Sequence, residues 1–431
     1  MRAMKDSGVE WIGEIPAEWE IGRVKNIFIR KNEKAMLENP IVLSLARAGV
    51  HIRDISNNEG QIALSYYNYN PVDVGDLLLN PMDLYSGANC SISRVKGVIS
   101  PAYVNLKGKN NVDARYYDYY FKVQYWQMVF FSYGKGVSFE NRWTLTNETL
   151  MNFKVLMLSY SEQQRIADYL DKKCAEIDEI ISKQHSIIEK LKEYKLSLIT
   201  ETVTKGLNAD VEMKDSGIEW IGEIPKHWKI ESFRHVLKER NEKNTPVKSK
   251  ERLSLSIELG VTLYAEKTTN LDRFKDDYEQ YKIAHVGDLV MNSMNMIVGA
   301  SGVSKYYGCV SPAYYTFYDE ESDHIKAKFC EYIFRSKTMR RVLFSLGKGI
   351  YAIVRGNDRV NTCRLKVSKD DLKNIKIPLP PVTEMRDIIH YIEQKSLKIE
   401  NIIENKQKLI NKLTEYKKSL IYEVVTGKKE V

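Results

Sequence analysis

The chain has 431 residues, of which 43% are hydrophobic, and a formal net charge of +8 at pH 7. This length allows two or three domains, and the apolar content excludes a chain that is disordered throughout. No stretch reaches the roughly 18 to 20 apolar residues that a bilayer requires, and the charged Met1–Ile15 does not resemble a signal peptide, so we expect a soluble, cytoplasmic protein with no membrane partner.

The cysteines and the distribution of charge narrow the function classes further. The segments 161–204 and 383–431 together hold 17 basic and 17 acidic residues, so the basic excess lies in the rest of the chain. A nucleic acid, if one binds, is expected to bind there. No C-x-x-C pair occurs, which argues against a zinc ribbon or a disulfide framework. The five cysteines are Cys90, Cys174, Cys309, Cys330 and Cys363.

The first 157 residues have the composition of a folded domain with short strands. They are rich in Val, Ile, Tyr and Phe, punctuated by Gly and Pro, with short alternating runs such as Ile41–Leu45 and Asp76–Leu79. A helical pattern is predicted near Tyr116–Val129. We therefore predict a mixed α/β (α+β) domain.

Two loops of this domain are candidates for contacts with DNA. The first, Gly134–Leu145, carries Lys135, Asn141, Arg142 and Trp143. Glycine allows close backbone approach, and Arg and Asn have the geometry to bond base edges, whereas Lys is better suited to phosphates. The alternative is a solvated loop that caps a strand. A second candidate loop carries Arg47, His51 and Arg53.

A long helix is predicted next, over Ser161–Thr204, because these 44 residues contain no Gly or Pro. Apolar residues recur at heptad spacing, broken by Gln184 and Lys195. Gly206 follows the pattern as a C′ glycine does.

The sequence then repeats its opening segment. Met213–Ile230 repeats Met4–Ile21 with 14 of 18 residues identical, and Lys412–Thr426 repeats Lys190–Thr204 with 11 of 15 identical. The shorter strings Gly-Asp-Leu, Ser-Pro-Ala-Tyr and Gly-Lys-Gly also recur in the same order. A period this long indicates a domain duplication rather than a solenoid. The near-identical parts are predicted to be shared scaffold, and the divergent parts between them two different readers.

The second half is predicted to hold the same elements. A helical pattern covers Ala327–Leu343, and Gly347–Arg359 corresponds to the first candidate loop. Its candidate DNA-binding residues, together with two asparagines further upstream, are Lys348, Tyr351, Arg355, Asn357, Arg359, Asn292 and Asn295. A second long helix follows over 383–426, before Gly427.

One heptad stripe cannot be buried alone, so each long helix needs a partner. Two copies related by a two-fold axis would pair antiparallel. The alternative is that each helix packs only on its own domain. Gln184 and Lys406 occupy equivalent seam positions, where they either fix the register or are simply exposed. The predicted seam residues are Leu170, Ile177, Ile181, Ile188, Leu191, Leu198, Ile392, Ile399, Ile403, Ile410, Leu413 and Leu420.

We predict four segments: a recognition domain over 1–157, a helical spacer over 158–212, a second recognition domain over 213–378 and a second spacer over 379–431. We find no catalytic motif. Asn80-Pro81-Met82-Asp83 resembles an amino-methyltransferase loop, but its copy at Asn292 lacks the proline and no cofactor loop precedes either. No Walker A motif and no histidine cluster occur. We therefore expect no catalytic residue, no metal and no cofactor in this chain.

The order and duplication of these motifs resemble the specificity subunits of type I restriction-modification enzymes. The resemblance rests on the repeated KDSGxEWIGEIPxxW openings, the GDL and SPAY strings, the PLPPVTE entry to the second helix and the EYKxSLIxExVT endings, and it covers essentially the whole chain. Two local departures, Leu158-Ser159-Tyr160 before the first helix and Glu384-Met385 in the second, concern only how the helices are entered.

The resemblance implies two target-recognition domains, each reading one half of a split site in double-stranded DNA. The helices would form an antiparallel coiled coil that sets the gap. Two methyltransferase subunits would dock on the repeated regions, and motor-nuclease subunits would join them. S-adenosylmethionine, ATP and Mg would belong to those partners. The alternative from another class is a coiled-coil adaptor that binds proteins only and has no DNA specificity.

Overall fold

The computed structural model describes residues 2–55, 63, 65–136, 143–267, 277–321, 323–350, 354–355, 359–360 and 364–431, with backbone only for 350, 354–355, 359–360 and 364. Two compact units make up the chain. Unit 1 comprises Met1–Gln184 and Gln407–Val431, and unit 2 comprises His185–Lys406. Both long helices, α5 (Tyr160–Lys205) and α11 (Val382–Val425), contribute to both units.

Unit 1 contains a four-stranded antiparallel sheet in the order β4-β11-β8-β9. Its strands are β1 (Met4–Asp6), β2 (Glu14–Pro16), β3 (Glu20–Arg23), β4 (Phe28–Lys31), β5 (Leu43–Ala46), β6 (Gly49–Ile52), β7 (Asn70–Val72), β8 (Leu77–Leu79), β9 (Cys90–Ile92), β10 (Gly97–Ile99), β11 (Val104–Gly108) and β12 (Lys154–Met157). Its shorter helices are α1 (Val24–Ile27), α2 (Ala114–Trp126), α3 (Val129–Ser132) and α4 (Asn147–Asn152).

Unit 2 repeats this sheet as β16-β23-β20-β21. Its strands are β13 (Met213–Asp215), β14 (Glu223–Pro225), β15 (Lys229–Ser232), β16 (Lys238–Arg240), β17 (Leu253–Ser256), β18 (Gly260–Leu263), β19 (Lys282–Ala284), β20 (Leu289–Asn292), β21 (Ser301–Val303), β22 (Gly308–Val310), β23 (Tyr314–Tyr318), β24 (Lys348–Ile350), β25 (Val354–Arg355), β26 (Arg359–Val360), β27 (Arg364–Lys366) and β28 (Lys376–Leu379). Its shorter helices are α6 (Phe233–Val236), α7 (Tyr264–Lys267), η2 (Tyr278–Gln280), η3 (Met296–Val298), α8 (Ile325–Arg335), α9 (Lys337–Leu346) and α10 (Lys369–Asn374).

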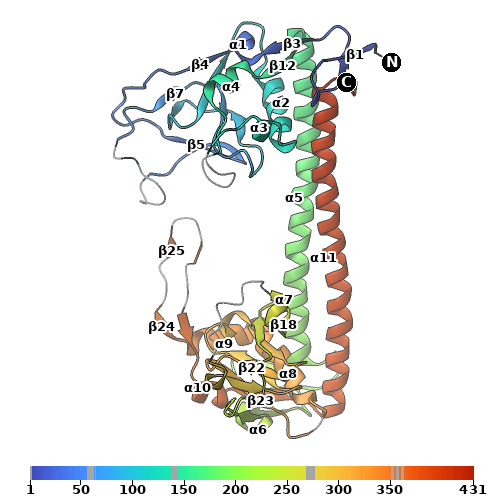
Figure 1. Cartoon of the computed structure of the whole chain (residues 1–431). Coiled ribbons are helices and arrows are strands. Elements are labelled where there is room, and N and C mark those ends of the chain that lie inside the picture. The colour runs from blue at the N-terminus through green and yellow to red at the C-terminus, as the bar shows by residue number, and fades with distance from the viewer. Residues whose placement is uncertain are drawn as a thin grey trace. The chain divides into compact units, whose positions relative to one another are not determined.

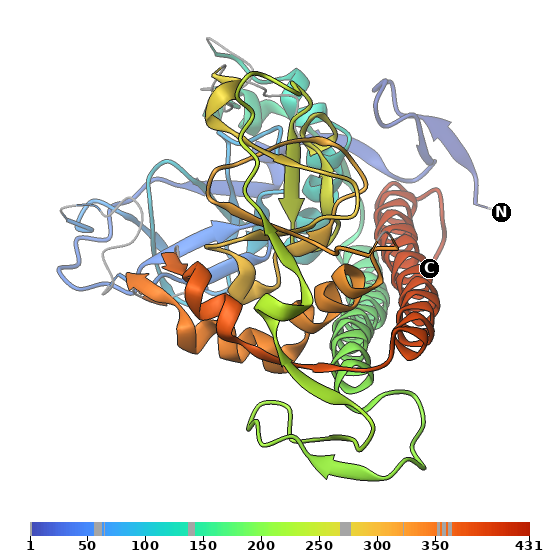
Figure 2. The same ribbon diagram turned by 90° about the horizontal axis from the view of Figure 1, so that it is seen from below.

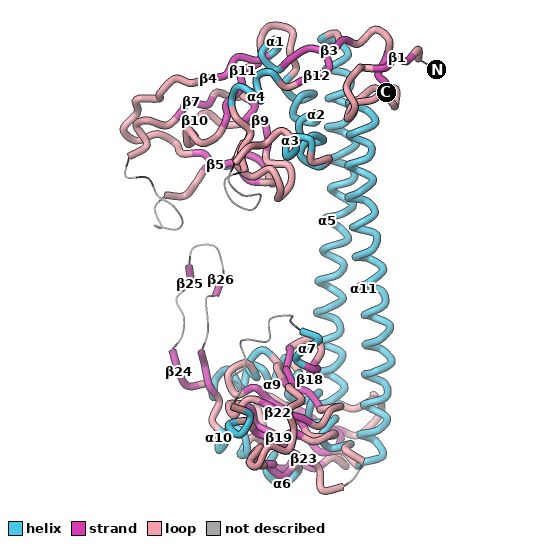
Figure 3. The backbone as a smooth tube through the Cα atoms, in the orientation of Figure 1, coloured by secondary structure: helices cyan, strands magenta, loops and turns pink. Residues whose placement is uncertain are grey.

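The strands are short and joined by long loops (Figure 3). The central strands β8 and β20 are buried throughout, in keeping with their apolar sequences, to which only Asn292 at the end of β20 is an exception. The repeated Gly-Asp-Leu string places a buried aspartate in front of each. Asp76 pairs with Lys31 at 2.8 Å, and Asp288 pairs with Arg240 at 2.6 Å. These pairs tie the central strand to the edge strand of the sheet in both units, so the repeated string belongs to the scaffold.

The long helices lie side by side within each unit and run antiparallel, as Figures 1 and 2 show from two directions. In unit 1, Lys417 Nζ lies 2.6 Å from Asp178 Oδ2. In unit 2, Lys195 Nζ lies 2.5 Å from Glu400 Oε1. Lys417 and Glu400 lie 222 residues after Lys195 and Asp178, respectively, so the second ion pair repeats the first with the helices exchanged. The predicted antiparallel pair is confirmed.

Most of the predicted seam is covered. Leu170, Ile177, Ile188, Leu198, Ile392, Ile399, Ile410 and Leu420 are buried, and Ile181, Leu191, Ile403 and Leu413 are half-buried. The helices also pack on their domains, since Leu170 of α5 and Leu420 of α11 share the core of unit 1 with Tyr116 and Phe121 of α2. Packing on the other helix and packing on the domain therefore occur together. Gln184 and Lys406 are half-buried.

The repeated opening motif fastens the ends of the helices to the domains. Trp19 and Trp228 are fully buried, and their indole N–H groups donate to first-turn glutamates of the long helices, Glu162 at 2.9 Å and Glu384 at 3.0 Å. Gly427, which ends α11, packs against Trp19, and Gly206, which ends α5, packs against Trp228. One tryptophan in each unit thus contacts the start of one helix and the end of the other.

The helical patches differ from the prediction in one respect, because each is two helices rather than one. In unit 2, Ser336 separates α8 from α9, and its side chain accepts a hydrogen bond from the Met339 N–H as the N-cap of α9. In unit 1, Met128 adopts a left-handed conformation, with φ 60°, between α2 and α3. Apolar periodicity continues across both breaks, which is why the sequence pattern does not show them.

Candidate nucleic-acid interface

A loop of the same length follows the central strand in both units. We call it the glycine loop: residues 80–87 in unit 1 and 292–299 in unit 2. The Asn80 side chain accepts from the Met82 N–H at 3.0 Å, and the Asn292 side chain accepts from the Met294 N–H at 3.1 Å. Both loops end in a glycine with positive φ, 122° at Gly87 and 91° at Gly299. The backbone of the loop is therefore part of the duplicated scaffold.

Each glycine loop is also joined to the segment that returns from its candidate DNA-binding loop. The Leu145 N–H donates to the Pro81 carbonyl at 2.8 Å, and the Val367 N–H donates to the Ser293 carbonyl at 3.1 Å. These two bonds are equivalent in the repeat. They place the base of the loop that begins at Gly134, and of the ribbon formed by β24 and β27, beside the glycine loop.

In unit 1 an aromatic row connects the two elements. The Tyr85 ring of the glycine loop lies 6.1 Å from Phe131, and Phe131 lies 5.8 Å from Trp143. The Trp143 indole N–H donates to the Phe131 carbonyl at 2.8 Å. A Cβ atom at Gly134 would lie 2.4 Å from Trp143 Nε1, so only glycine fits beneath this ring. Tyr85 is 75% exposed, so its ring offers a free aromatic face.

The second candidate loop of unit 1 lies against the same glycine loop. Arg47 is exposed between β5 and β6, and its Nε lies 3.9 Å from the Cβ position of Gly87. Lys135 is exposed, and its backbone pairs with Thr144. The fold thus places Arg47, Lys135 and Trp143 around the glycine loop of unit 1. His51 instead bonds to Ser44 at 2.8 Å along the β5–β6 ribbon, and the Arg53 N–H donates to the Val42 carbonyl.

In unit 2 the corresponding surface keeps one lysine, Lys348 for Lys135, and otherwise consists of different residues. Asn295 is exposed at the N-cap of η3, and Lys348 is exposed at the start of β24. Lys348 lies 3.4 Å from Asp371. Asn292 is buried, and its bond to Met294 ties its side chain to the loop itself. The backbone of Arg355 and Arg359 forms β25 and β26. Asn141, Arg142, Tyr351 and Asn357, and the side chains of Arg355 and Arg359, lie outside the described residues.

The described part of the chain contains no group of His, Cys, Asp and Glu that could hold a metal ion. The Asn80–Asp83 string is occupied by loop contacts, since the Asp83 carboxylate accepts from the Asn89 amide at 2.9 Å and from the Ser86 N–H at 3.2 Å. Burial raises the pKa of the Cys90 and Cys330 thiols, which disfavours the thiolate that a nucleophile needs. No described helix is long and apolar enough to cross a membrane.

Solved structures match the chain over nearly its whole length. One is a chain from a structure of a type I R-M system solved to explain its complex assembly and conformational transition, with a TM-score of 0.65, 12% identity, and coverage of 96% of this chain and 99% of that one. Another is the HsdS subunit from Thermoanaerobacter tengcongensis, with a TM-score of 0.50, 12% identity, and coverage of 96% and 98%. No family model matches the chain. The chain has the fold of a type I restriction-modification specificity subunit.

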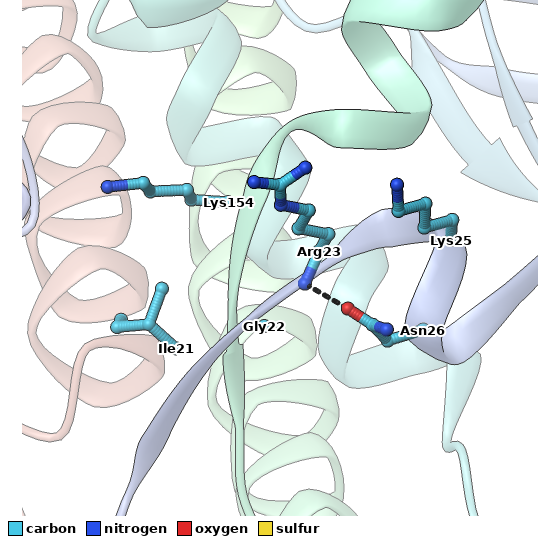
Figure 4. Close-up of a pocket in the computed structure, with 6 residues that line it drawn as sticks. All are labelled: Ile21, Gly22, Arg23, Lys25, Asn26 and Lys154. Carbon is cyan, nitrogen blue, oxygen red and sulfur yellow. Dashed lines mark hydrogen bonds between the residues drawn. The ribbon is translucent and has the colours of Figure 1, made fainter.

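A second basic surface lies in unit 1. A shallow pocket between β3 and β12 is lined by Arg23, Lys25 and Lys154 with Ile21, Gly22 and Asn26 (Figure 4). The Arg23 N–H donates to the Asn26 side chain at 2.8 Å, and Lys25 Nζ donates to Asn152 at 2.8 Å. In unit 2 the equivalent of Gly22 is Glu231, which bonds His235 at 2.8 Å. The pocket is therefore not part of the duplicated scaffold.

Two residues of the candidate interface were not predicted from the sequence. Tyr85 lies in the glycine loop, where an exposed aromatic residue before a glycine offers a weak signal. Arg340 lies on α9, and its guanidinium group packs over Gly299. A single arginine in an amphipathic helix reads as a solvated residue, so only the three-dimensional packing identifies it.

Proposed function

We propose that this chain is the DNA-specificity subunit of a type I restriction-modification enzyme and that each recognition domain reads one half of a bipartite site. The observation that carries the proposal is the pair of glycine loops, whose backbones are held by equivalent hydrogen bonds. Beside a lysine that both units share, Lys135 and Lys348, the side chains at these loops differ: Arg47 and Tyr85 in unit 1, and Asn295 and Arg340 in unit 2. Different side chains on one scaffold suit two different half-sequences.

A selection from random duplex DNA, made with the chain in complex with its methyltransferase partner, tests this reading. We expect an asymmetric site of two short sequences separated by a fixed gap. Affinity should fall steeply with salt, because phosphate contacts release counterions. A coiled-coil adaptor that binds only proteins would enrich no sequence and would show no salt-dependent DNA affinity, and that result would replace the proposal.

We also propose that the paired helices set the gap between the half-sites. Each added residue extends a helix by about 1.5 Å. Residues inserted into one helix near Gln184 should therefore change the gap recovered in the same selection while both half-sequences stay unchanged. A change in the bases read at constant gap would contradict this role.

The docking of two methyltransferase subunits is supported by a surface that occurs once in each unit. In unit 1, Ile180, Leu409 and Tyr416 are exposed. Each has an equivalent in unit 2 that lies 222 residues away from it in the sequence, and these equivalents are exposed as well. The unit 2 residues are Ile402, Ile187 and Tyr194. All six occupy the heptad position just before a seam position, which is held by Lys195 after Tyr194 and by Lys417 after Tyr416. In an antiparallel pair this position of one helix flanks the same position of the other, so the residues of each set lie on one flank of the helix pair, and we call each set an apolar triad.

In unit 1 the triad faces away from the contacts between helix and domain. There, Asp171 of α5, on the other flank of the seam, accepts from Tyr119 at 2.8 Å and from Arg115 at 3.0 Å. Exposed apolar residues that repeat with the symmetry of the chain fit two copies of one partner. We propose that each triad receives one methyltransferase subunit, which supplies the S-adenosylmethionine chemistry, while this chain carries no cofactor and no catalytic residue.

Native mass spectrometry of the complex tests the docking proposal. Replacing Ile180 and Tyr416 by Glu should reduce the number of bound methyltransferase subunits from two to one, because both residues belong to the triad of unit 1. Asn411→Glu, an exposed position on the same helix, is the matched control and should leave two subunits bound. Two subunits on the double variant would show that docking uses another surface. Restriction subunits with ATP and Mg would then join the methyltransferase, and such an assembly would act on DNA in the cytoplasm.

A further inference from the structure

Arg340 is an arginine without an acidic partner. Two other partly buried arginines of unit 2 are paired with acids: Arg240 with Asp288 at 2.6 Å, and Arg335 with Glu331 at 3.0 Å. The Arg340 side chain makes no hydrogen bond or ion pair with any described residue, and its Nε is buried without an acceptor. Burial, and next the charge of Arg335, lower the pKa of Arg340. An arginine nevertheless stays protonated at neutral pH, so α9 carries an uncompensated charge.

The position of this charge is fixed by the glycine loop. A Cβ atom at Gly299 would lie 2.5 Å from Arg340 Nη2 and 2.7 Å from Nε, so the guanidinium group rests directly on the loop backbone. Gly299 also has a φ of 91°, which favours glycine. The group is therefore held in place beside Asn295 and cannot extend freely as a surface arginine does.

Unit 1 reaches the same arrangement by another route. Gly347 corresponds to Gly134, so Arg340 corresponds to Gln127, and the helix of unit 1 supplies no cation there. Instead Arg47, from the turn between β5 and β6, places its Nε 3.9 Å from the Cβ position of Gly87. An arginine therefore lies beside the equivalent glycine in both units, although it comes from different elements. A recurrent charge at one place on the scaffold indicates a ligand feature that both halves share.

We propose that Arg340 binds a phosphate of the DNA backbone at the half-site read by unit 2. The inference rests on the proposed DNA-reading function and adds a residue and its role to it. Holding a half-buried cation without a counter-ion is unfavourable, and a phosphate oxygen supplies the missing charge and acceptor. A phosphate is also the feature that every DNA half-site offers regardless of sequence, which suits an arginine placed on the shared part of the loop.

The test compares Arg340→Gln with Arg341→Gln in the full chain in complex with its methyltransferase partner. Arg341 is the next residue on α9 and is exposed, so it controls for loss of one charge from the same helix. Dissociation constants are measured over a range of salt concentrations on the selected duplex and on a random-sequence duplex. For Arg340→Gln we expect about tenfold weaker binding to both duplexes at low salt, and a slope of log affinity against log salt that is smaller by about 1. Arg341→Gln should change neither.

Two further measurements separate a phosphate contact from a structural role. Arg340→Lys keeps the charge and should recover most of the affinity and of the salt slope. The thermal unfolding temperature of Arg340→Gln should not fall, because the residue removed has no partner in the fold. A fall in unfolding temperature that accounts for the lost binding would overturn the proposal.

The remaining outcomes are equally informative. If the unaltered complex binds DNA but Arg340→Gln binds both duplexes as tightly, the phosphate assignment is wrong while the proposed function stands. If the loss is confined to the selected duplex, with relaxed preference at one base, Arg340 contacts a base and the phosphate assignment also fails. If the unaltered complex itself shows no salt-dependent affinity for DNA, the failure lies with the proposed function.

Discussion

The two glycine loops share their backbone bonds and differ in most of their outward side chains. Tyr85 is exposed where its equivalent Ile297 is buried, and the half-buried Asp83, which bonds Ser86 and Asn89, corresponds to the exposed Asn295. The bonds at Asn80 and Asn292, by contrast, are the same. The difference teaches that, within these loops, the repeated asparagines serve the fold itself, whereas the side chains that diverge at exposed positions are free to serve a ligand.

The strongest test of this distinction between repeated and diverged residues concerns the repeated tryptophans. Replacing Trp19 or Trp228 by Ala should each cost about 3–5 kcal/mol of stability, because a fully buried ring is lost and a glutamate at a helix start loses its donor. Each loss should be confined to its own unit and the two should be similar. Amide hydrogen exchange, followed separately in peptides of each unit, measures this. Glu10→Ala, an exposed position in the same hairpin, should have little effect; unequal losses would show that the repeat is not one scaffold used twice.

A smaller effect is expected at the diverged loops. Arg142→Ala or Arg355→Ala should weaken binding at one half-site only, by about 1 to 3 kcal/mol, with relaxed preference at one base pair if the arginine is bidentate to guanine. Binding to variants of each half-site, measured in turn, shows which half is affected. Equal weakening on random DNA would make either residue a phosphate contact, and no change at all would remove its loop from the interface.

The scaffold could be predicted from the sequence because duplication and periodicity report on packing. The 44 residues without Gly or Pro predict α5 to within a residue at each end, and Gly206 and Gly427 end the helices with positive φ as expected. The breaks at Met128 and Ser336 could not be predicted, because apolar spacing continues across them. Tertiary packing alone determines where those helices turn.

The candidate site was only partly predictable, for a physical reason. Lys135, Trp143 and Arg47 stand out because Arg, Lys and Trp near glycine suit DNA, but the sequence does not indicate that they gather around Gly87. That depends on hydrogen bonds between distant segments, such as Leu145 to Pro81. Arg340 has no local signal, since its significance lies in the absence of an acid near it in space. Repeated strings in the sequence point to residues that have a partner inside the fold, whereas nothing in the sequence marks a residue that lacks one.

The smallest expected effect is a difference in acid sensitivity between the units. Glu239 of β16 lies 2.6 Å from Lys369 Nζ and 2.5 Å from Lys373 Nζ of α10. Burial acts to raise the pKa of Glu239, but the hydrogen bonds from the two lysines outweigh it and hold the pKa below the ordinary value of 4.5. In unit 1 the equivalent residues are Arg30, Asn147 and Met151, so no acid is held in this way.

A carboxyl group whose pKa is lowered by folding stabilises the fold above its ordinary pKa, and this contribution is lost as the pH falls through the lower value. Acidification below 4.5 should therefore loosen the contact of α10 with β16 more than the contact of α4 with β4. Because the ion pairs are only partly buried, we expect the loss of stability to be less than about 1 kcal/mol.

Glu239→Gln should be less stable than the unaltered chain at pH 7 and equal to it in acid, as judged by hydrogen exchange in peptides covering α10. Glu258→Gln, at an exposed position of the same unit, is the control. If Glu239→Gln still lost as much stability on acidification as the unaltered chain, another carboxyl group would cause the acid sensitivity of unit 2. The difference between the two units would then not be caused by Lys369 and Lys373.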